Sequence, residues 1–407
     1  MSKSSPATSS KSWPAKLFAF FASYELALFC LGLLTLLTFF GTIEQKTYGL
    51  YQTAEKYFDM DAFFLLPEWP RADGSGWKIP LPLPGTYWVS VLLFINMLCG
   101  GIIRARKGWK TVGVLISHFG ILFMLVAGFV SSLKKKEGVM MVYEEERSDF
   151  ARSYHDPTLE VFTYEQNERG TPWVVPTESL ENLDRDDVLT AEFPQLPFSL
   201  EIRGYLPAAE MRSVSAPIDG ADPTSEPVVD GFYLRETIRQ PEEELNMQGC
   251  YVRVLDQAGE EVRRLLLWAG NHAPVSFTID GQRYGILMPR EIWPMPFEVE
   301  LHKSVGDYWP GTRKARWFQS DITKIADGHR EDYSIVMNKP MRHGGYTLYQ
   351  ARWDKPQDRA FSGFAIVRNP SDQWPKYSLY VVTFGLLVHF GYMLVRYLTN
   401  AFSAKKP

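Results

Sequence analysis

The sequence predicts a polytopic α-helical membrane protein with four transmembrane helices and a large external, mainly β and sandwich-like domain between helices three and four. Three observations lead to this fold class. Four apolar segments are long enough to cross a bilayer, the polar stretch between the last two is rich in strand-like runs, and basic residues cluster beside the segment ends. The overall composition, 45% hydrophobic and 22% charged, hides the membrane segments because the polar stretch dilutes them.

Each of the four apolar segments has a length within the roughly 17 to 25 residues that span about 30 Å of hydrocarbon. They are Leu17–Phe40, Thr86–Ile103, Thr111–Leu133 and Tyr377–Val395. Glu25 is their only formal charge, and we assign it no role. The first segment is too long for a signal peptide and lacks a small-residue cleavage site, so we expect a retained anchor.

Basic residues predict the orientation, since Lys and Arg concentrate on the cytoplasmic side of a membrane. They stand before the first segment, in the short loop between segments two and three, and after the fourth. These residues are Lys3, Lys11 and Lys16; Arg104, Arg106, Lys107 and Lys110; and Arg396, Lys405 and Lys406. Both termini are therefore expected in the cytoplasm, which leaves the triplet Lys134, Lys135 and Lys136 as one violation of the rule.

The resulting topology places the large polar stretch outside the cytoplasm. In chain order we expect a cytoplasmic tail (1–16), a transmembrane helix (17–40), an external loop (41–85), a second transmembrane helix (86–103), a cytoplasmic loop (104–110), a third transmembrane helix (111–133), the external β-rich domain (134–376), a fourth transmembrane helix (377–395) and a cytoplasmic tail (396–407).

The external stretch shows strand and hairpin signals. Residues 251–268 and 274–288 each contain two strand-like runs around turn residues, and the Asp280-Gly281 pair is typical of a tight hairpin. Further strands are expected at 159–164, 198–206, 297–305, 346–353 and 361–367. Short helices are expected at 184–188 and 235–246, and a proline-rich surface loop at 216–229.

Several function classes are excluded by what the sequence lacks. Cys30 and Cys99 fall inside apolar segments and Cys250 stands alone outside them, so no disulfide is expected in the external domain. No CxxC, CxxCH, Walker A, GxGxxG or HExxH motif is present, and the net charge of -4 gives no sign of nucleic-acid binding. The external histidines show no HxH or HxxxH spacing, so we expect no external metal site and name no catalytic residue.

Two histidines lie inside apolar segments, where imidazole is costly unless it is paired, hydrated or bound to a metal. His118 lies seven residues after Thr111 and His389 seven before Arg396, which places both about 10 Å from the cytoplasmic helix ends. At matched depth they are candidate cofactor-binding residues, able to ligate haem iron together or each with a partner's histidine. The alternative is a histidine that hydrogen-bonds across a helix interface and binds no ligand.

Three sequence blocks carry a resemblance to a known family. They are GTIEQ at Gly41–Gln45, the basic loop leading into VGVLISHFG around His118, and HGGYTLYQARWD at His343–Asp354. With the order of helices and β domain, these blocks resemble the ResB family, also called CcsB, of system II cytochrome c biogenesis. Two features depart from its usual pattern: Glu44 stands where members more often have proline, and NPSDQWP before the last segment matches only weakly.

The resemblance implies a function shared with other molecules. Such proteins act with a CcsA- or ResC-type membrane protein that carries a tryptophan-rich WWD motif, which this chain lacks. Together they move ferrous haem b outward and join its vinyl groups to the CxxCH cysteines of apocytochrome c. His118 then corresponds to one axial ligand of the haem iron and is the metal-binding residue of the site. The second axial ligand is expected on the partner.

The resemblance also implies a location and a division of labour. The chain is expected in the bacterial cytoplasmic (inner) membrane, as a multi-pass protein whose large domain lies on the periplasmic side and holds apocytochrome c. It would be a non-autonomous subunit of a haem lyase, or holocytochrome c synthase. Tyr346, Tyr349, Arg352 and Trp353 suit a binding surface, although alternation turns half of such residues toward a β core.

Two other functions stay open from the residues alone. In the first, His118 and His389 bind haem b within this chain, which is then a bis-histidine membrane electron carrier. In the second, the chain is a non-catalytic, membrane-anchored assembly or sensor protein whose external domain binds a partner. Haem bound by the chain alone would favour the first, and function without either histidine the second.

Overall fold

The computed structural model describes residues 12–71, 76–165, 168–181, 183–215, 227–312, 314–356 and 359–403. The chain forms two compact units. A helical unit comprises Met1–Lys135 and Asn369–Pro407, and a β unit comprises Lys136–Arg368. The β unit is thus inserted in the chain between two helices of the helical unit. Four of the lysines that predict the orientation lie outside the described residues: Lys3, Lys11, Lys405 and Lys406.

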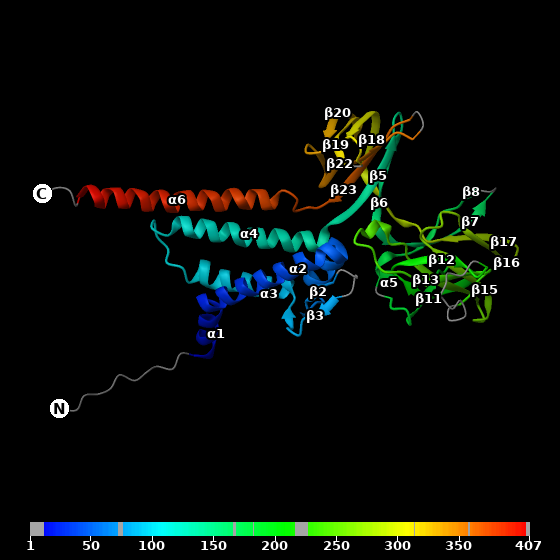
Figure 1. The fold of residues 1–407 in the computed structure, drawn as a ribbon, viewed down its shortest axis with the longest axis horizontal. Helices are drawn as coiled ribbons and strands as arrows, with labels where there is room; N and C mark the ends of the chain where they lie inside the picture. Colours follow the sequence, from blue (N-terminus) through cyan, green and yellow to red (C-terminus); the bar gives the residue numbers. More distant parts are fainter. Residues whose placement is uncertain are drawn as a thin grey trace, which may run out of the picture. The chain divides into compact units, whose positions relative to one another are not determined.

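The helical unit contains the apolar helices that the sequence predicts (Figure 1). Its elements are α1 (Trp13–Phe21), α2 (Tyr24–Phe58), α3 (Thr86–Asn96), the π-helix η1 (Met97–Ile103), α4 (Val112–Lys134) and α6 (Trp374–Ser403), with short strands β1 (Phe64–Leu65), β2 (Glu68–Pro70), β3 (Gly76–Lys78) and β4 (Leu83–Pro84). Among the described residues, four helices are long and apolar enough to cross a membrane: α2, α3 continued by η1, α4 and α6. This finding indicates a membrane protein.

The first predicted segment, Leu17–Phe40, is wrong as a single helix, because the helix is interrupted between Phe21 and Tyr24. The Ser23 side chain caps α2 by accepting a hydrogen bond from the Leu26 amide at 3.2 Å. Asn96 of α3 donates to the carbonyls of both Phe21 and Ser23, at 2.7 and 2.8 Å. Backbone groups left free by the interruption are thereby satisfied.

The interruption gives Glu25 a different setting from the one expected in mid-segment. Glu25 is exposed and lies in the first turn of α2. Free amides and the helix dipole make this end of a helix favourable for a carboxylate. Glu25 therefore marks the beginning of a helix and not a charge buried deep within one.

The predicted loop 41–85 is also partly wrong, because α2 continues to Phe58 and is broken only at Gly49, which has φ 82°. The chain folds back after this glycine, and Lys56 and Tyr57 reach Glu44. The buried Glu44 carboxylate accepts hydrogen bonds from Lys56 Nζ at 2.7 Å, from the Tyr57 hydroxyl at 2.6 Å and from the Glu68 amide at 2.6 Å. The buried Glu44 carboxylate thus holds the fold-back in place.

The other predicted segments agree more closely with the helices. Segment Thr86–Ile103 coincides with α3 and η1 together, and Thr111–Leu133 differs from α4 by one residue at each end. The fourth helix is longer than expected and includes residues 396–403 of the predicted cytoplasmic tail. No proline or glycine interrupts this stretch, so the helix continues. The side of the membrane that each helix end faces stays a prediction.

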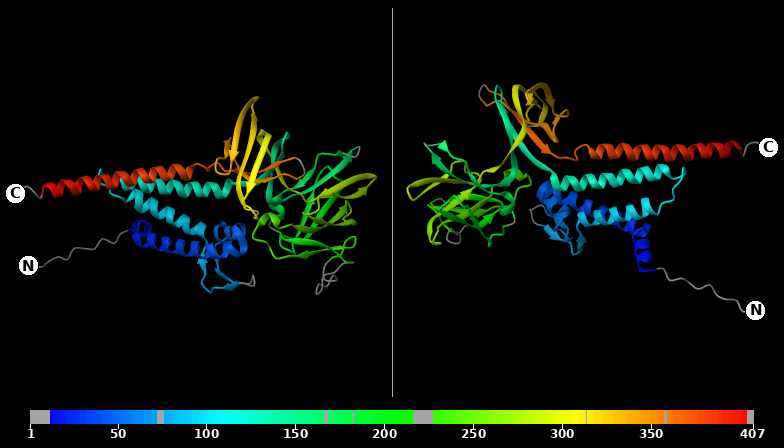
Figure 2. Two further views of the ribbon diagram at one scale, coloured as in Figure 1. Left: turned by 45° about the horizontal axis from the view of Figure 1, so that its top comes forward. Right: turned by 180° about the vertical axis from the view of Figure 1, so that it is seen from behind.

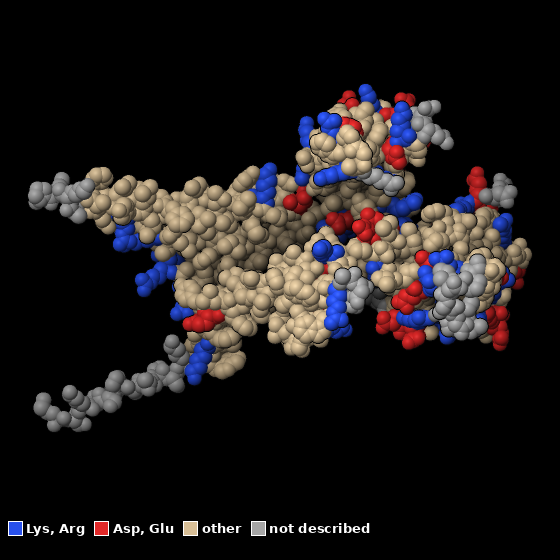
Figure 3. Space-filling view, in the orientation of Figure 1, with Lys and Arg blue, Asp and Glu red and all other residues tan. Residues whose placement is uncertain are grey.

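Within the helical unit, α6 runs antiparallel to α4, α4 packs on η1, and α3 packs on α2 (Figures 1 and 2). The helices present a mostly uncharged surface in Figure 3, where tan covers most of their length. Most large side chains of α6, including Phe384, Leu387 and Leu394, are exposed. Such a surface suits lipid or another membrane helix, because both are apolar and exclude water from the exposed side chains.

The β unit contains one antiparallel sheet of eight strands, in the order β20-β19-β18-β6-β5-β23-β22-β21. These strands are β5 (Lys136–Tyr143), β6 (Arg147–Pro157), β18 (Arg290–Tyr308), β19 (Ala315–Ala326), β20 (His329–Val336), β21 (Met341–His343), β22 (Tyr346–Asp354) and β23 (Phe361–Arg368). The sheet curls, so that β19 and β22 contact each other around a core that includes Val299, Leu348 and Phe364.

The rest of the β unit is a sandwich, in which a four-stranded sheet (β10-β11-β14-β15) and a five-stranded sheet (β16-β17-β7-β8, with β9 paired to β7) share one core. The strands are β7 (Leu159–Glu165), β8 (Glu168–Arg169), β9 (Trp173–Val175), β10 (Val188–Glu192), β11 (Phe198–Leu206), β14 (Gly249–Asp256), β15 (Glu261–Trp268), β16 (Val275–Ile279) and β17 (Gln282–Leu287). A separate pair, β12 (Ala209–Ser213) and β13 (Phe232–Glu236), contacts β14 and β15. The short helix α5 (Thr177–Glu181) and a 3-10 turn at Glu243–Leu245 contact β6.

The strand predictions are largely confirmed, and the short-helix predictions are wrong. Both hairpins form, and Asp280 and Gly281 have φ of 50° and 80°, as a type I′ turn requires. Residues 188 and 235–236 belong to strands, and only a 3-10 turn forms in the second predicted helix. Most of the proline-rich loop, residues 216–226, lies outside the described residues.

Candidate functional site

His118 lies on α4 and contacts the end of η1. Its Nδ1 is 3.1 Å from the carbonyl oxygen of Gly101. Because a carbonyl oxygen can only accept, Nδ1 must carry the proton of this hydrogen bond. In a neutral imidazole the lone pair then lies on Nε2, the nitrogen able to bind a metal.

The contact depends on a glycine. A Cβ on residue 101 would lie 2.9 Å from His118 Nδ1 and 3.3 Å from its Cγ, which is too close without movement. The adjacent Gly100 makes a similar approach on another side, where a Cβ would lie 3.1 Å from the Ala22 carbonyl oxygen. The glycine pair therefore lets η1 pack against both α4 and the junction of α1 and α2.

The wide turn of η1 contributes to this arrangement. The Arg104 amide bonds to the carbonyl of Cys99, five residues earlier, at 2.9 Å. Because η1 ends at Ile103, no amide within the helix reaches the Gly101 carbonyl. The imidazole of His118 satisfies that carbonyl in an apolar setting, where an unpaired backbone oxygen would be costly.

The opposite face of α4 packs against α6 through small residues. Gly113, Ser117 and Gly120 of α4 face Ser378 and Gly385 of α6. A Cβ on Gly385 would lie 2.5 Å from Ser117 Oγ and 2.7 Å from the Gly113 carbonyl oxygen. Small residues of this kind let the backbones of membrane helices approach closely.

Hydrogen bonds extend along this α4–α6 seam. Ser378 Oγ donates to the Gly120 carbonyl at 2.6 Å and Ser117 Oγ lies 3.2 Å from the Val382 carbonyl. Nearer the other end, Ser371 Oγ donates to the Ala127 carbonyl at 2.9 Å. The seam is thus closed along much of α4.

His389 lies on α6 at a different level from His118. A Cβ on Gly113 would lie 2.6 Å from the His389 backbone nitrogen, so His389 is level with Gly113. Gly113 precedes His118 by five residues, or about 7 Å along an α-helix. The predicted matched depth is therefore wrong, because helix packing and not distance from the nearest basic residue sets the level.

The structure does not bring the two imidazoles together. No hydrogen bond or ring contact joins them within the described ranges, and His389 Nδ1 is buried there without a hydrogen-bond partner. The described residues also contain no group of three or more His, Cys, Asp or Glu side chains that could hold a metal ion. A ligand role for either histidine stays a prediction.

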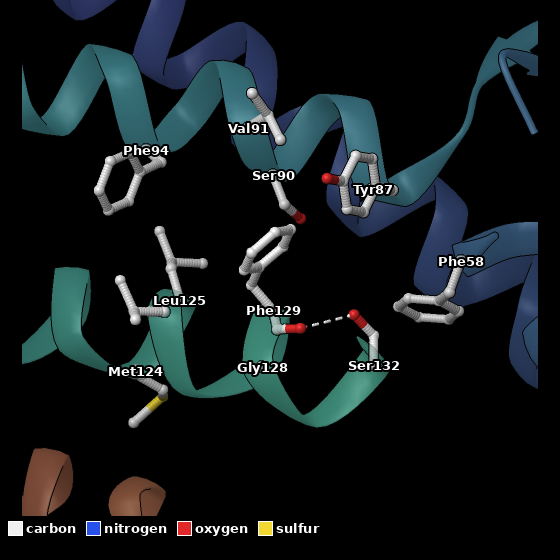
Figure 4. A pocket seen from close by; sticks show the side chains of 11 residues that line it. Phe58, Tyr87, Ser90, Val91, Phe94, Met124, Leu125, Gly128, Phe129 and Ser132 are labelled. Carbon is white, nitrogen blue, oxygen red and sulfur yellow. Dashed lines mark hydrogen bonds between the residues drawn. The ribbon is translucent and has the colours of Figure 1, made fainter. Parts of the chain in front are cut away.

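A pocket of about 490 Å³ lies between α3 and α4 (Figure 4). Most of its lining is apolar, and Figure 4 shows the Phe129 ring directed from α4 toward Ser90 of α3. The lining residues are Phe58, Tyr87, Ser90, Val91, Phe94, Met124, Leu125, Val126, Gly128, Phe129 and Ser132.

The pocket and the His118–Gly101 contact occupy the same seam between helices. Leu125, Phe129 and Ser132 follow His118 by 7, 11 and 14 residues, which places them on the same face of α4. Phe94 precedes Gly101 by seven residues. The α3–α4 seam is therefore held at one end by the imidazole and open to an apolar pocket about 10 Å away.

The HGGYTLYQARWD block is mainly structural. Tyr346 and Leu348 are buried in the core of the eight-stranded sheet, and Trp353 packs against Gly306 and Phe318. His343 Nδ1 lies 3.2 Å from the ammonium of the buried Lys324. Of the four residues expected to suit a binding surface, Tyr346 is buried, Tyr349 and Trp353 are half-buried, and Arg352 is exposed.

Cys250 is free and fully buried in the sandwich core, and burial raises the pKa of its thiol to about 12. A thiol of this kind stays protonated and unreactive at neutral pH. Its role is therefore packing, in agreement with the prediction that the domain folds without a disulfide.

The fold and the seam together define a class: a membrane protein with apolar helices and a folded β unit, whose α3–α4 seam contains a hydrogen-bonded imidazole and, about 10 Å farther along, an apolar pocket. Residues 254–391 match the ResB-like family, which is associated with cytochrome c biogenesis. The match confirms the resemblance over the second half of the β unit and the first part of α6. It includes His389 but not His118. No curated protein shows a significant match to the chain.

Sequence reasoning missed two features of the site. The first is Gly101, although the Gly100-Gly101 pair inside an apolar segment was a visible signal of close approach. The second is the pocket, which arises from contacts between segments about 35 residues apart and leaves no local pattern.

Proposed function

We propose that this chain holds haem within a membrane cytochrome c synthase complex, for attachment to the CxxCH cysteines of apocytochrome c. The observation that carries the proposal is the Nδ1 contact of His118 with Gly101 at 3.1 Å. It leaves Nε2 as the ligating nitrogen of an imidazole within an apolar helix, and imidazole is a common axial ligand of haem iron.

The surroundings support a haem. Its ring is flat and largely apolar, and the pocket of about 490 Å³, which begins about 10 Å along α4 from His118, is lined mostly by apolar side chains. Ser90, Ser132 and Tyr87 add a few polar groups, as ligand pockets usually do. The haem is cargo: it supplies the iron that His118 binds and the vinyl groups that react with the client's thiols.

The second axial ligand would come from a partner. His389 is about 7 Å along the helix from the level of His118 and contacts Gly113 on the opposite seam. This arrangement gives no support to haem bound between the two histidines of one chain. A membrane protein of the CcsA or ResC type, with its WWD motif, is the partner that we infer, and ferrous haem b the cargo.

The β unit would receive apocytochrome c on the far side of the membrane from the basic loop at 104–110. In this arrangement the chain positions reactants and protects the iron, while the thiols and vinyl groups of the substrates supply the bonds that form. In this proposal the chain itself supplies no general acid, general base or nucleophile.

The test compares haem content with and without the partner. The full chain is purified after expression alone and after co-expression with a WWD-type protein, with that protein alone as the control. We expect stoichiometric haem and maturation of a CxxCH reporter cytochrome only when both are present. Stoichiometric haem in the chain alone would favour the bis-histidine carrier, and maturation by the partner alone would contradict the proposal.

A further inference from the structure

We propose that the Gly101 carbonyl is a positioning group that fixes which nitrogen of His118 is presented to the iron. The inference rests on the proposed function for the identity of the ligand. The tautomer of His118, however, is a property of the haem-free chain and can be measured by itself.

The Gly101 carbonyl determines the direction of the hydrogen bond to His118. Gly101 offers an acceptor only, and the 3.1 Å contact is made by Nδ1, so the Nδ1–H tautomer is selected. No amide within η1 competes for the carbonyl, and a hydrocarbon environment supplies little water to replace the imidazole. The preference is therefore stronger than it would be for an exposed histidine.

The hydrogen bond to Gly101 also affects how His118 would bind iron. Metal-binding histidines commonly donate their other N–H to a carbonyl or carboxylate, which holds the ring in place and raises the basicity of the ligating nitrogen. Gly101 supplies this second group here. Loss of such a partner typically lowers metal affinity by about 10- to 100-fold.

A side chain added at residue 101 would displace the His118 ring. The Cβ of alanine would meet the His118 ring at 2.9 Å, whereas the backbone of α4 is not among the nearest atoms. Rotation of the ring is then the easiest response, and it breaks the hydrogen bond. Gly101→Ala is therefore expected to misdirect the imidazole without separating the helices.

The experiment uses the full chain with Gly101→Ala, His118→Ala and the matched control Gly32→Ala. Gly32 lies on the apolar helix α2, and a Cβ there would meet nothing within 4 Å. The first readout is ¹⁵N NMR of the haem-free chain labelled at histidine, with the His118 signal assigned from a His118→Gln sample. The second is haem retained by the complex with the WWD-type partner, at equal complex assembly.

We expect a proton on Nδ1 in the native chain and in Gly32→Ala, and loss of that preference in Gly101→Ala. Haem affinity should fall by about 10- to 100-fold in Gly101→Ala and stay native in Gly32→Ala. A proton on Nε2 in the native chain would overturn the inference, even if Gly101→Ala does not assemble.

Two further outcomes separate this inference from the proposed function. If His118→Ala loses haem while Gly101→Ala retains it as Gly32→Ala does, the positioning role is wrong and the ligand role stands. If His118→Ala retains haem, the ligand role is wrong, and with it the purpose that we assign to Gly101.

Discussion

The two faces of α4 differ in how they meet their neighbours. Toward α6 the helices touch through glycines and serines, with hydrogen bonds from side chains to backbone. Toward α3 and η1, His118 makes the close contact at one end, and a pocket of about 490 Å³ separates the helices at the other. One helix thus has a closed face that holds α6 in place and a face with room for a ligand. If the proposed function holds, the face toward α6 mainly stabilises the helical unit and the face toward α3 and η1 takes the haem.

The largest expected effect is on the closed face. Gly385→Ala would bring a Cβ within 2.7 Å of the Gly113 carbonyl oxygen, so the helices must separate. We expect a loss of about 1–3 kcal/mol in the free energy of unfolding, as for other overpacked sites. Thermal and denaturant unfolding in detergent, followed by circular dichroism, measure it. Gly391→Ala on the same helix is the control, since a Cβ there meets nothing within 4 Å; equal effects of the two would contradict the close packing.

A smaller effect on stability is expected on the open face. Gly128 lines the pocket, and a Cβ there would also meet nothing within 4 Å. Gly128→Leu should therefore leave the free energy of unfolding unchanged or raise it, because it replaces a helical glycine by a better helix former, while it fills part of the pocket. We expect reduced haem content in the complex with the partner. Native haem content, with the folded state intact, would remove the pocket from the proposed haem site.

The β unit was the most predictable part of the chain, because its signals are local. Alternation of apolar residues gave β11 at residues 198–206, and the Asp280-Gly281 pair gave the β16–β17 hairpin. Turn residues and side-chain period act within a few positions, so a sequence displays them directly. Several strands of five or more residues have no matching prediction: β5, β6, β10, β12, β13, β19 and β20.

For the helical unit, the number of long apolar helices could be predicted from the sequence, but their bounds and interruptions could not. Hydropathy found all four apolar helices but not the interruption before Tyr24 or the fold-back at Gly49. Both depend on backbone angles and on distant partners, such as Asn96 for the first and Glu44 for the second. Apolar composition carries no information about either.

The candidate site was half predictable. A histidine inside an apolar segment is visible in the sequence, so His118 and His389 could be chosen as candidate residues. The levels of the two histidines did not, because the helix-to-helix register comes from glycine and serine contacts between α4 and α6. The partner of His118 could not be predicted either, since it is a backbone carbonyl of another helix.

The most direct test of the account compares His118→Ala with His389→Ala in the assembled complex with the partner. The haem content per complex is measured by absorbance, with equal assembly checked by co-purification. We predict that His118→Ala loses nearly all haem, that added imidazole restores it by filling the vacated coordination position, and that His389→Ala retains most of it. Native haem content in His118→Ala, or equal loss from both substitutions, would contradict the account.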